Sequence, residues 1–280
     1  MKLVRSTLRC TLFVALLLAT CVDGHIRKLF FGLRPGPKGA VWVHRWCRRI
    51  VRALGVVCEV EGRPPIVTKH GLAVVSNHLS YLDILIYSAV TPFVMVAKSE
   101  VRSWPLLGWI TAQAGTVYVQ RSDLKGGRTQ THAQVNAAMR EAFRSGLPVL
   151  FFPEGTTTDG SEILPFRRGL YHSVLADDIP MTTAALAYAL DEPNPGATVA
   201  NDVCYWGDMV FAPHLFHCLG LHGLRTRIRF DSTRVEGDDR FALAIHSRQS
   251  IVALYTDLQT ALAVEQSAYE TAEHESIATA

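Results

Sequence analysis

The chain of 280 residues is 49% hydrophobic and carries 28 Lys and Arg against 25 Asp and Glu, a formal net charge of +3. This length and composition exclude a disordered or low-complexity protein and allow a full hydrophobic core. The charge is uneven, because residues 1–60 hold eleven Lys and Arg against two acids, Asp23 and Glu59. The basic leading segment indicates contact with an anionic surface, either phospholipid headgroups or nucleic acid.

The N-terminal segment begins with basic residues followed by an apolar run. Lys2, Arg5 and Arg9 precede the run Thr11–Val22, an order similar to the charged and hydrophobic regions of a signal peptide. About 20 apolar residues are needed for a helix to cross a bilayer. The shorter run therefore fits a signal sequence, an anchor that enters one leaflet, or a buried helix.

A second helix is predicted over Ala40–Val57, after the hinge Pro35-Gly36-Pro37. Its arginines and tryptophans form a basic amphipathic pattern that is typical of a helix lying in the membrane interface. The alternative is a surface helix packed on its own domain, with arginine side chains covering apolar surface. Nucleic acid is not expected as a partner, because the apolar face is too large for a phosphate-binding arm. The apolar residues at helical spacing are Trp42, Val43, Trp46, Ile50, Val51 and Leu54.

The rest of the chain alternates short apolar runs with helical patterns, which predicts an α/β fold with a mixed central sheet flanked by helices. We expect three parts: a membrane-associating helical segment over residues 1–56, the α/β domain over 57–235, and a packing helix with a frayed tail over 236–280. The predicted strands are Val56–Val60, Leu72–Ser76, Phe93–Ala97, Thr116–Gln120, Pro148–Phe152, Met181–Ala187 and Leu224–Phe230. The predicted helices of these two parts are Tyr81–Ala89, Trp104–Gln113, Arg128–Ser145 and Phe241–Ala263.

The six cysteines show neither a CxxC pair nor zinc-finger spacing to histidine, so the sequence predicts no metal site and no disulfide framework. We expect reduced thiols on the cytoplasmic side of a membrane. The cysteines are Cys10, Cys21, Cys47, Cys58, Cys204 and Cys218.

The stretch Val74–Asp83 ends an apolar run with Asn77 and His78 and places an aspartate five residues after the histidine. A strand end holds such an imidazole rigidly, while the following turn leaves it open to a substrate. An aspartate across the turn can bind one ring nitrogen, fix the tautomer and stabilise the imidazolium. The alternative is structural, because Ser80 and Asp83 also fit a capping box that begins a helix.

Four motif blocks resemble, in order, those of the glycerolipid acyltransferases, and they most closely resemble the bacterial 1-acylglycerol-3-phosphate acyltransferases. The resemblance extends from about residue 40 to residue 230. The ordered combination is specific, although a histidine and an aspartate at this spacing are not specific alone. The blocks are Asn77-His78 with Asp83, Gly115–Arg121, Phe152–Thr157 and Ile179–Met181.

The resemblance implies that a fatty acyl group moves from a thioester of coenzyme A or acyl carrier protein to the hydroxyl of lysophosphatidate, giving phosphatidate. His78 would be the general base for the hydroxyl, and Asp83 would hold the His78 ring and offset its charge. The acyl donor is a co-substrate, and no further cofactor and no metal are implied. We expect the protein at the cytoplasmic face of the inner membrane of a bacterium, as a monotopic or N-terminally anchored protein.

The acceptor phosphate needs several hydrogen-bond donors, and the resemblance implies which basic residues supply them. Arg121, at the end of a predicted strand, matches the arginine of the second block, although a strand-end arginine can also be merely solvated. Lys98 matches a basic position that would bind the acceptor phosphate. Arg168 matches one that would bind this phosphate or those of the donor. Arg167 fits surface solvation equally well and is assigned no role.

The third block is implied to contact the acceptor through Glu154, Gly155 and Thr156. The Glu154 carboxylate would accept a hydrogen bond from the glycerol hydroxyl or position Arg121, and the amides of Gly155 and Thr156 would face the anion. The alternative is that Glu154 only caps the next turn. Thr157 stands where the family often has serine, which keeps a hydroxyl at that position.

The acceptor stays open on the sequence alone. The stretch Trp206–Met209 is similar to one in bacterial relatives that include acyltransferases for lyso-ornithine lipid, so another lysolipid is the alternative to lysophosphatidate. A third hypothesis is a membrane lipid-binding protein that keeps the frame without catalysis. Intact His78, Asp83, Arg121 and Glu154 argue against it, because a purely structural role does not need all four.

Overall fold

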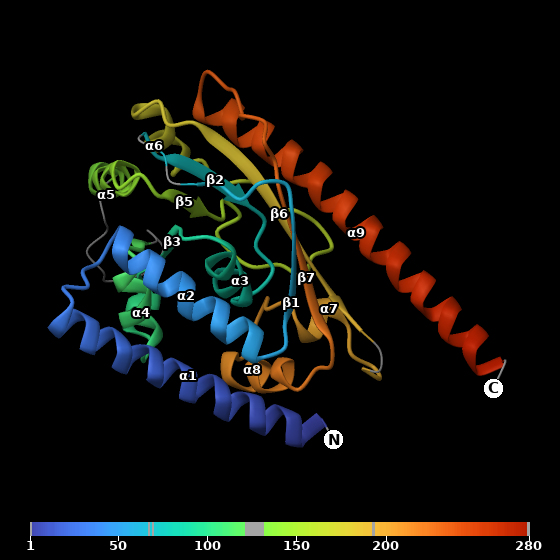
Figure 1. Cartoon of the computed structure of the whole chain (residues 1–280). Helices are drawn as coiled ribbons and strands as arrows, with labels where there is room; N and C mark the ends of the chain where they lie inside the picture. Colours follow the sequence, from blue (N-terminus) through green and yellow to red (C-terminus); the bar gives the residue numbers. More distant parts are fainter. Residues whose placement is uncertain (1, 67, 69, 121–131, 192–193, 279–280) are drawn as a thin grey trace.

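The computed structural model describes residues 2–66, 68, 70–120, 132–191 and 194–278, and these form the α/β fold that the sequence predicts (Figure 1). The strands form one seven-stranded sheet in the order β1-β7-β6-β2-β5-β3-β4. All neighbouring strands are parallel except β6 and β7, so the sheet is mixed. The strands are β1 (Val57–Glu61), β2 (Leu72–Ser76), β3 (Val94–Lys98), β4 (Val117–Val119), β5 (Pro148–Phe151), β6 (Met181–Leu190) and β7 (Leu224–Phe230).

Helices cover both faces of the sheet. In Figure 1, α2 and α3 lie on one side of the sheet, and α9 lies across β6 and β7 on the other. A short 3-10 turn, Ser99–Ser103, joins β3 to α4. The helices are α1 (Lys2–Phe30), α2 (Pro37–Ala53), α3 (Leu82–Val90), α4 (Leu107–Gln113), α5 (His132–Arg144), α6 (Tyr171–Ala176), α7 (Val199–Asp202), α8 (Phe211–Leu219) and α9 (Arg240–Ala278).

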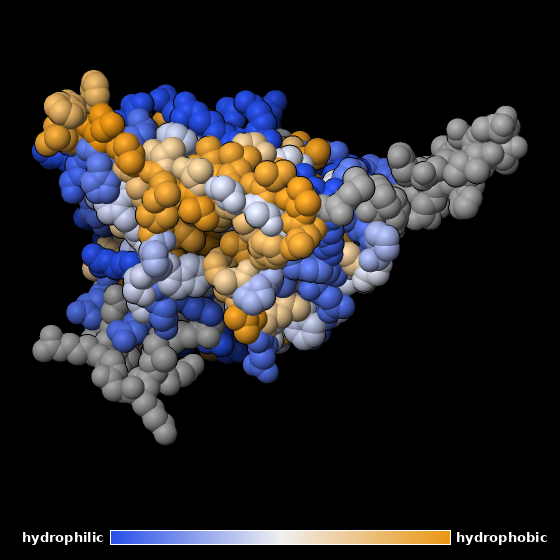
Figure 2. Space-filling model, turned by 90° about the horizontal axis from the view of Figure 1, so that it is seen from below, coloured by the Kyte–Doolittle hydropathy of each residue, from blue (hydrophilic) through white to orange (hydrophobic). Residues whose placement is uncertain are grey.

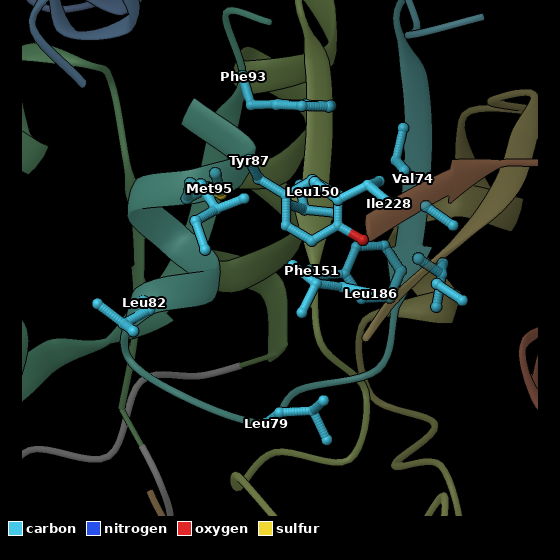
Figure 3. Packing of buried hydrophobic residues seen from close by; sticks show 14 of the residues in the cluster. Val74, Leu79, Leu82, Tyr87, Phe93, Met95, Leu150, Phe151, Leu186 and Ile228 are labelled. Carbon is cyan, nitrogen blue, oxygen red and sulfur yellow. The ribbon is translucent and has the colours of Figure 1, made fainter. Parts of the chain in front are cut away.

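The main core lies between α3 and the sheet. Tyr87 of α3 points at the strands and is surrounded by Leu150, Leu186 and Ile228 from β5, β6 and β7 (Figure 3). The Tyr87 hydroxyl is hydrogen-bonded to Ser76 Oγ at 2.6 Å, so its buried polar atom is satisfied at the end of β2. This contact fixes α3, which follows the predicted catalytic turn, against the strand that precedes the turn.

The predicted strands agree with the observed ones to within one or two residues, except that β6 is three residues longer than predicted. The register pairs Ser76, the last residue of β2, with Ala184, and β6 then continues to Leu190 while pairing only with β7. β6 therefore extends past the end of β2, alongside the turn that carries His78.

Helix α1 is much longer than the apolar run Thr11–Val22 from which it was inferred, and it spans 29 residues. The polar residues after the run have partners that let the helix continue. The Asp23 carboxylate accepts hydrogen bonds from the indole N–H groups of Trp42 and Trp46, both at 2.8 Å, and from Arg27 at 2.9 Å. The Asp23 contacts join α1 to α2.

The basic residues at the start of α1 bind the carboxyl end of α8. Arg5 donates to the carbonyl of Gly220 at 2.7 Å, and Arg9 donates to the carbonyl of Leu221 at 2.7 Å. Carbonyl groups at a helix end carry partial negative charge, so guanidinium groups are stabilising there. α1 is thus an integral element of the fold, in contact with α2, α4 and α8.

The interfacial interpretation of the apolar face of α2 is wrong, and the alternative of a helix packed on its own domain is correct. Trp42, Val43, Ile50 and Leu54 are buried, and α2 packs against α3. An amphipathic pattern does not tell whether its apolar face meets lipid or protein. The arginines of α2 remain exposed at positions 45, 48, 49 and 52.

The exposed apolar surface belongs to α1 instead. Figure 2 looks at the molecule from below, the side on which α1 lies in Figure 1, and shows an orange band across this face. Among the described residues, α1 is also the single helix long and apolar enough to cross a membrane. Its exposed large hydrophobic residues are Leu3, Val4, Leu8, Leu12, Val14, Leu18, Val22, Ile26, Leu29 and Phe30.

Two C-terminal features differ from the prediction. The segment Ala197–Gly220, in which no helix was predicted, contains two helices, α7 and α8. Helix α9 continues to Ala278, whereas the helix was predicted over Phe241–Ala263 and was expected to be followed by a frayed tail. The added residues include several Ala and Glu, which favour helix, so the backbone continues past the part of α9 that packs on the sheet.

Candidate active site

The predicted site residues gather at one edge of the sheet because of the strand order. β2, β5 and β3 are parallel neighbours, so their carboxyl ends lie at the same edge, where ligands bind in open α/β sheets. His78 follows the end of β2, Glu154 follows β5, and Lys98 is the last residue of β3.

Asn77 connects the end of β2 to β6. Its side-chain Nδ2 donates to the carbonyl of Leu186 at 2.9 Å, and its Oδ1 accepts from the amide of Leu186 at 2.9 Å. The side chain is fully buried and replaces the backbone pairing that β2 no longer makes. His78 therefore starts its turn from a fixed position.

His78 and Asp83 are directly hydrogen-bonded, with 2.7 Å between Nδ1 and Oδ2. The carboxylate can only accept, so His78 Nδ1 must carry the proton and Nε2 is the ring nitrogen with a free lone pair. The His78 ring stacks on Phe152 at 4.1 Å between centroids and 10° between planes. A fixed tautomer and a fixed ring plane suit a general base.

Asp83 is completely buried and holds the whole turn together. Besides His78, its Oδ2 accepts from the amides of Leu79 at 2.7 Å and Ser80 at 3.0 Å. The predicted capping interpretation is thus partly correct, because the carboxylate does bind backbone amides at the start of α3. The same carboxylate binds the imidazole, so the two interpretations describe one arrangement.

Tyr188 supplies the remaining contact of Asp83 and was missed by the sequence analysis. Its hydroxyl donates to Asp83 Oδ1 at 2.5 Å from β6. The residue lies in the part of β6 beyond the predicted end at Ala187. The alternation of side chains along a strand puts Tyr188 on the same face as Leu186, which was the available signal.

Glu154 binds the turn that carries His78 and is 3% exposed. Its Oε1 accepts from the backbone amide of His78 at 2.8 Å and its Oε2 accepts from the amide of Leu164 at 2.9 Å. Burial raises the pKa of Glu154 to about 7, although the two amide donors act in the opposite direction. The carboxylate therefore binds backbone at both oxygens, which resembles the predicted capping alternative more than a contact with glycerol.

Gly155 adopts a left-handed conformation, with φ of 69°, and approaches Arg167 closely. A Cβ atom at Gly155 would lie 2.8 Å from Cδ and Nε of Arg167. The Gly155 amide donates to the carbonyl of Phe152 at 3.1 Å, and the Arg167 amide donates to the carbonyl of Pro153 at 2.8 Å. The Gly155 amide is thus used in the turn instead of facing an anion, and Arg167 is the arginine that lies beside this block.

The other predicted binding residues have different positions. Thr156 is exposed on the turn, and Lys98 is exposed at the carboxyl end of β3. The Arg168 guanidinium lies 4.4 Å from the ring centre of Phe241 in α9, so it points to that helix. Arg121 lies outside the described residues.

The fold and the site define an α/β protein in which a histidine at the carboxyl edge of the sheet is hydrogen-bonded to a buried carboxylate, and comparison with known proteins gives its chemistry. The sequence profile of the family described as "Acyltransferase" matches residues 57–187. The 1-acyl-sn-glycerol-3-phosphate acyltransferase of Neisseria meningitidis serogroup B is 33% identical over 212 residues, which cover 75% of this chain and 79% of that protein.

Two further comparisons concern another named acyltransferase and a solved structure with a similar fold. The lyso-ornithine lipid O-acyltransferase of Rhodobacter capsulatus is 33% identical over 62% of this chain and 60% of its own length, so the match spans less than two thirds of that protein. The crystal structure of the 1-acyl-sn-glycerophosphate acyltransferase PlsC of Thermotoga maritima has the same fold, with a TM-score of 0.67, 14% identity and coverage of 92% and 98%.

The chain belongs to the acyltransferase family, and it is an enzyme that transfers acyl groups. The resemblance found in its four motif blocks is thereby confirmed. The relatives act on different lysolipids according to their names, so the family alone does not fix the acceptor.

Proposed function

We propose that the enzyme transfers a fatty acyl group from a thioester of coenzyme A or acyl carrier protein to the hydroxyl of lysophosphatidate, giving phosphatidate. The observation that carries the proposal is the hydrogen bond of 2.7 Å between His78 Nδ1 and the buried Asp83 carboxylate. It leaves Nε2 to act on an acceptor hydroxyl at an edge of the sheet where ligands bind.

The chemical step follows from this geometry. His78 Nε2 takes the hydroxyl proton as the acceptor oxygen attacks the thioester carbonyl, and Asp83 offsets the positive charge on the imidazolium. The tetrahedral intermediate then expels the thiolate, breaking the carbon–sulfur bond, and the proton on Nε2 passes to the sulfur. The ester and the free thiol are the products, and the enzyme returns to its starting protonation state.

The acceptor phosphate needs cationic donors near this edge. We assign the role to Lys98, which ends β3, to Arg121, and to Arg167, whose side chain lies along Gly155. Glu154 is given a supporting role, because its carboxylate accepts a hydrogen bond from the backbone amide of His78. Arg168 is a further phosphate contact in the resemblance, but its cation–π contact with Phe241 makes it the weaker candidate.

A different lysolipid acceptor is the alternative, and one observation favours it. The Tyr205 amide donates to the carbonyl of Leu79 at 2.8 Å, and the Trp206 indole donates to the carbonyl of Ala200 at 2.9 Å. The Trp206–Met209 stretch, which resembles lyso-ornithine lipid acyltransferases, therefore adjoins the turn that carries His78. A lipid-binding protein without catalysis is not favoured, because the complete set of contacts on Asp83 has no function in simple binding.

We place the enzyme on a membrane surface through α1. Its outward face carries the exposed apolar band, and the exposed arginines of α2 add positive charge for anionic headgroups (Figure 2). Because α1 is tied to α2 and α8 along its length, it would lie in the interface as a monotopic element. The cytoplasmic face of the bacterial inner membrane is the location that fits an acyl thioester as donor.

An acceptor panel tests the proposal. Purified protein is mixed with acyl-coenzyme A or acyl-acyl carrier protein and with lysophosphatidate or lyso-ornithine lipid, and release of free thiol is measured. The proposal predicts turnover with lysophosphatidate at a kcat/KM at least about tenfold above that with lyso-ornithine lipid. The reverse order would support the alternative acceptor, and lipid binding without turnover of any acceptor would support the non-catalytic hypothesis.

A further inference from the structure

The two oxygens of the Asp83 carboxylate have different hydrogen-bond partners. Oδ2 receives His78 Nδ1 and two backbone amides, all from the same turn, whereas Oδ1 receives the hydroxyl of Tyr188, 105 residues further along the chain. The local contacts would form in any turn of this shape. Among the residues that bind the Asp83 carboxylate, Tyr188 is the one that comes from a strand of the sheet.

The path of β6 explains why a tyrosine reaches this place. Asn77 pairs with Leu186, and Tyr188 lies two residues further along β6, on the same face. Tyr188 is 6% exposed, and burial, followed by the Asp83 charge, raises its pKa well above 10. The phenol therefore stays protonated at neutral pH and donates its hydrogen bond to Asp83 Oδ1.

We propose that Tyr188 is a positioning residue for the reaction, which orients the Asp83 carboxylate and through it sets the tautomer and ring plane of His78. This inference rests on the proposed function for its catalytic consequence. Without the phenol, Oδ1 would be a buried acceptor with no donor, and the carboxylate could rotate or take up a proton. Either change would weaken its hold on His78 Nδ1.

The neighbouring groups are consistent with this role. Two of the titratable groups around Asp83, those of Tyr188 and His78, are hydrogen-bonded to its carboxylate through their side chains. The other groups interact with the Asp83 charge only at longer range. They are Tyr87 of α3, Glu154 after β5, Cys204 before Trp206, and Tyr255 of α9.

The test compares Tyr188→Phe with Tyr171→Phe. Tyr171 is a matched control, because its hydroxyl is also buried and hydrogen-bonded, to Ser247 Oγ at 2.8 Å, but away from the site. We expect Tyr188→Phe to lower kcat about tenfold or more, to change KM by less than about twofold, and to shift the acid limb of the pH profile of kcat/KM. Tyr171→Phe should leave kcat and this limb unchanged.

A double variant shows whether the effect passes through Asp83. In an Asp83→Asn background, adding Tyr188→Phe should lower kcat by less than about twofold, since the group on which Tyr188 acts is already altered. A second full loss in the double variant would overturn the proposal. So would a Tyr188→Phe variant with wild-type kcat and pH profile, an equal loss in Tyr171→Phe, or a Tyr188→Phe variant that does not fold.

A measurement without substrate separates this inference from the proposed function. In protein labelled with ¹⁵N-histidine, the His78 signals, assigned by their loss in His78→Ala, should show a single tautomer with the proton on Nδ1. Tyr188→Phe should show a mixture of both tautomers, and Tyr171→Phe should not. An unchanged tautomer in Tyr188→Phe would overturn the positioning role, whereas failure of every acceptor to turn over would overturn the proposed function and leave this readout valid.

Discussion

The Glu154 carboxylate accepts a hydrogen bond of 2.8 Å from the backbone amide of His78, so the third motif block is directly bonded to the first. The second oxygen of Glu154 binds the amide of Leu164. The two strand ends that carry these blocks are thereby locked together through one buried side chain. A carboxylate in this position holds the backbone of His78, and its charge is partly balanced by the two amide dipoles.

Replacing Glu154 with glutamine should change how stability depends on pH. Burial raises the pKa of Glu154 from 4.5 to about 7 in the folded state. The folded protein thus binds this proton more tightly than the unfolded chain, so the contribution is fully present below pH 4.5 and is lost as the pH rises through about 7. The free energy of unfolding of the wild type, relative to Glu154→Gln, should fall by about 3 kcal/mol over this range.

Urea denaturation at several pH values from 4.5 to about 8 measures the difference in free energy of unfolding between the wild type and Glu154→Gln. The upper limit lies about one pH unit above the folded pKa of Glu154. Glu162→Gln is the control, since Glu162 is exposed and its replacement should leave the pH dependence as in the wild type. A difference between wild type and Glu154→Gln that stays constant or grows with pH would contradict the assignment.

Asp83→Asn should leave the protein folded and nearly inactive. The amide group keeps the volume of the carboxylate but cannot accept at both ends, so we expect a stability loss of about 1–3 kcal/mol. The tautomer of His78 is no longer fixed, and kcat should fall by about a hundredfold or more. Thiol release and urea denaturation measure the two effects, and intact catalysis with a large loss of stability would return Asp83 to a capping role.

Arg167→Ala should raise the KM for lysophosphatidate by about tenfold, because a charge-assisted contact to the phosphate is lost. The effect should exceed that of Arg168→Ala, because Arg168 points toward Phe241. Arg140→Ala serves as the control, since Arg140 is exposed and pairs with Asp177. A larger effect at Arg168 than at Arg167, measured by initial rates of thiol release, would reverse the assignment of the two arginines.

Polar substitutions on α1 should release the protein from membranes without unfolding it. Leu8, Leu18 and Val22 are exposed on the outward face, and changing all three to glutamine should lower binding to anionic vesicles by at least about tenfold. Sedimentation with vesicles measures binding.

The matched control makes the same change at three exposed residues of α9, Ile245, Val252 and Val264. Equal release by both triple variants would contradict a specific role of α1. Deleting residues 1–56 is a less selective experiment, because it would also remove the buried face of α2 from the core.

The fold was predictable because its signals are local. Seven apolar runs of strand length gave the seven strands, and the spacing of His78 and Asp83 within one turn put their side chains within reach of each other. The sequence could not predict contacts between residues that are far apart in the chain and are brought together by the fold. Tyr188 and Arg167 meet the site only because of the strand order and the turn around Gly155.

The N-terminal helices show a second limit of the sequence. The apolar pattern of α2 was correct, but a pattern records that one face avoids water and not what covers it. The buried face of α2 meets protein, and the exposed apolar face of α1 was underestimated because the run Thr11–Val22 was read without the polar residues that continue the helix. Asp23 and its two tryptophan partners supply that continuation.

The most direct test of the central claim is thiol release from acyl-coenzyme A in the presence of lysophosphatidate by His78→Ala, beside His172→Ala as an exposed histidine control. We predict that His78→Ala lowers kcat by at least about a hundredfold while the protein remains folded, and that His172→Ala keeps the wild-type rate. Turnover by His78→Ala within a few-fold of the wild type would contradict the account, because His78 would then not be the base.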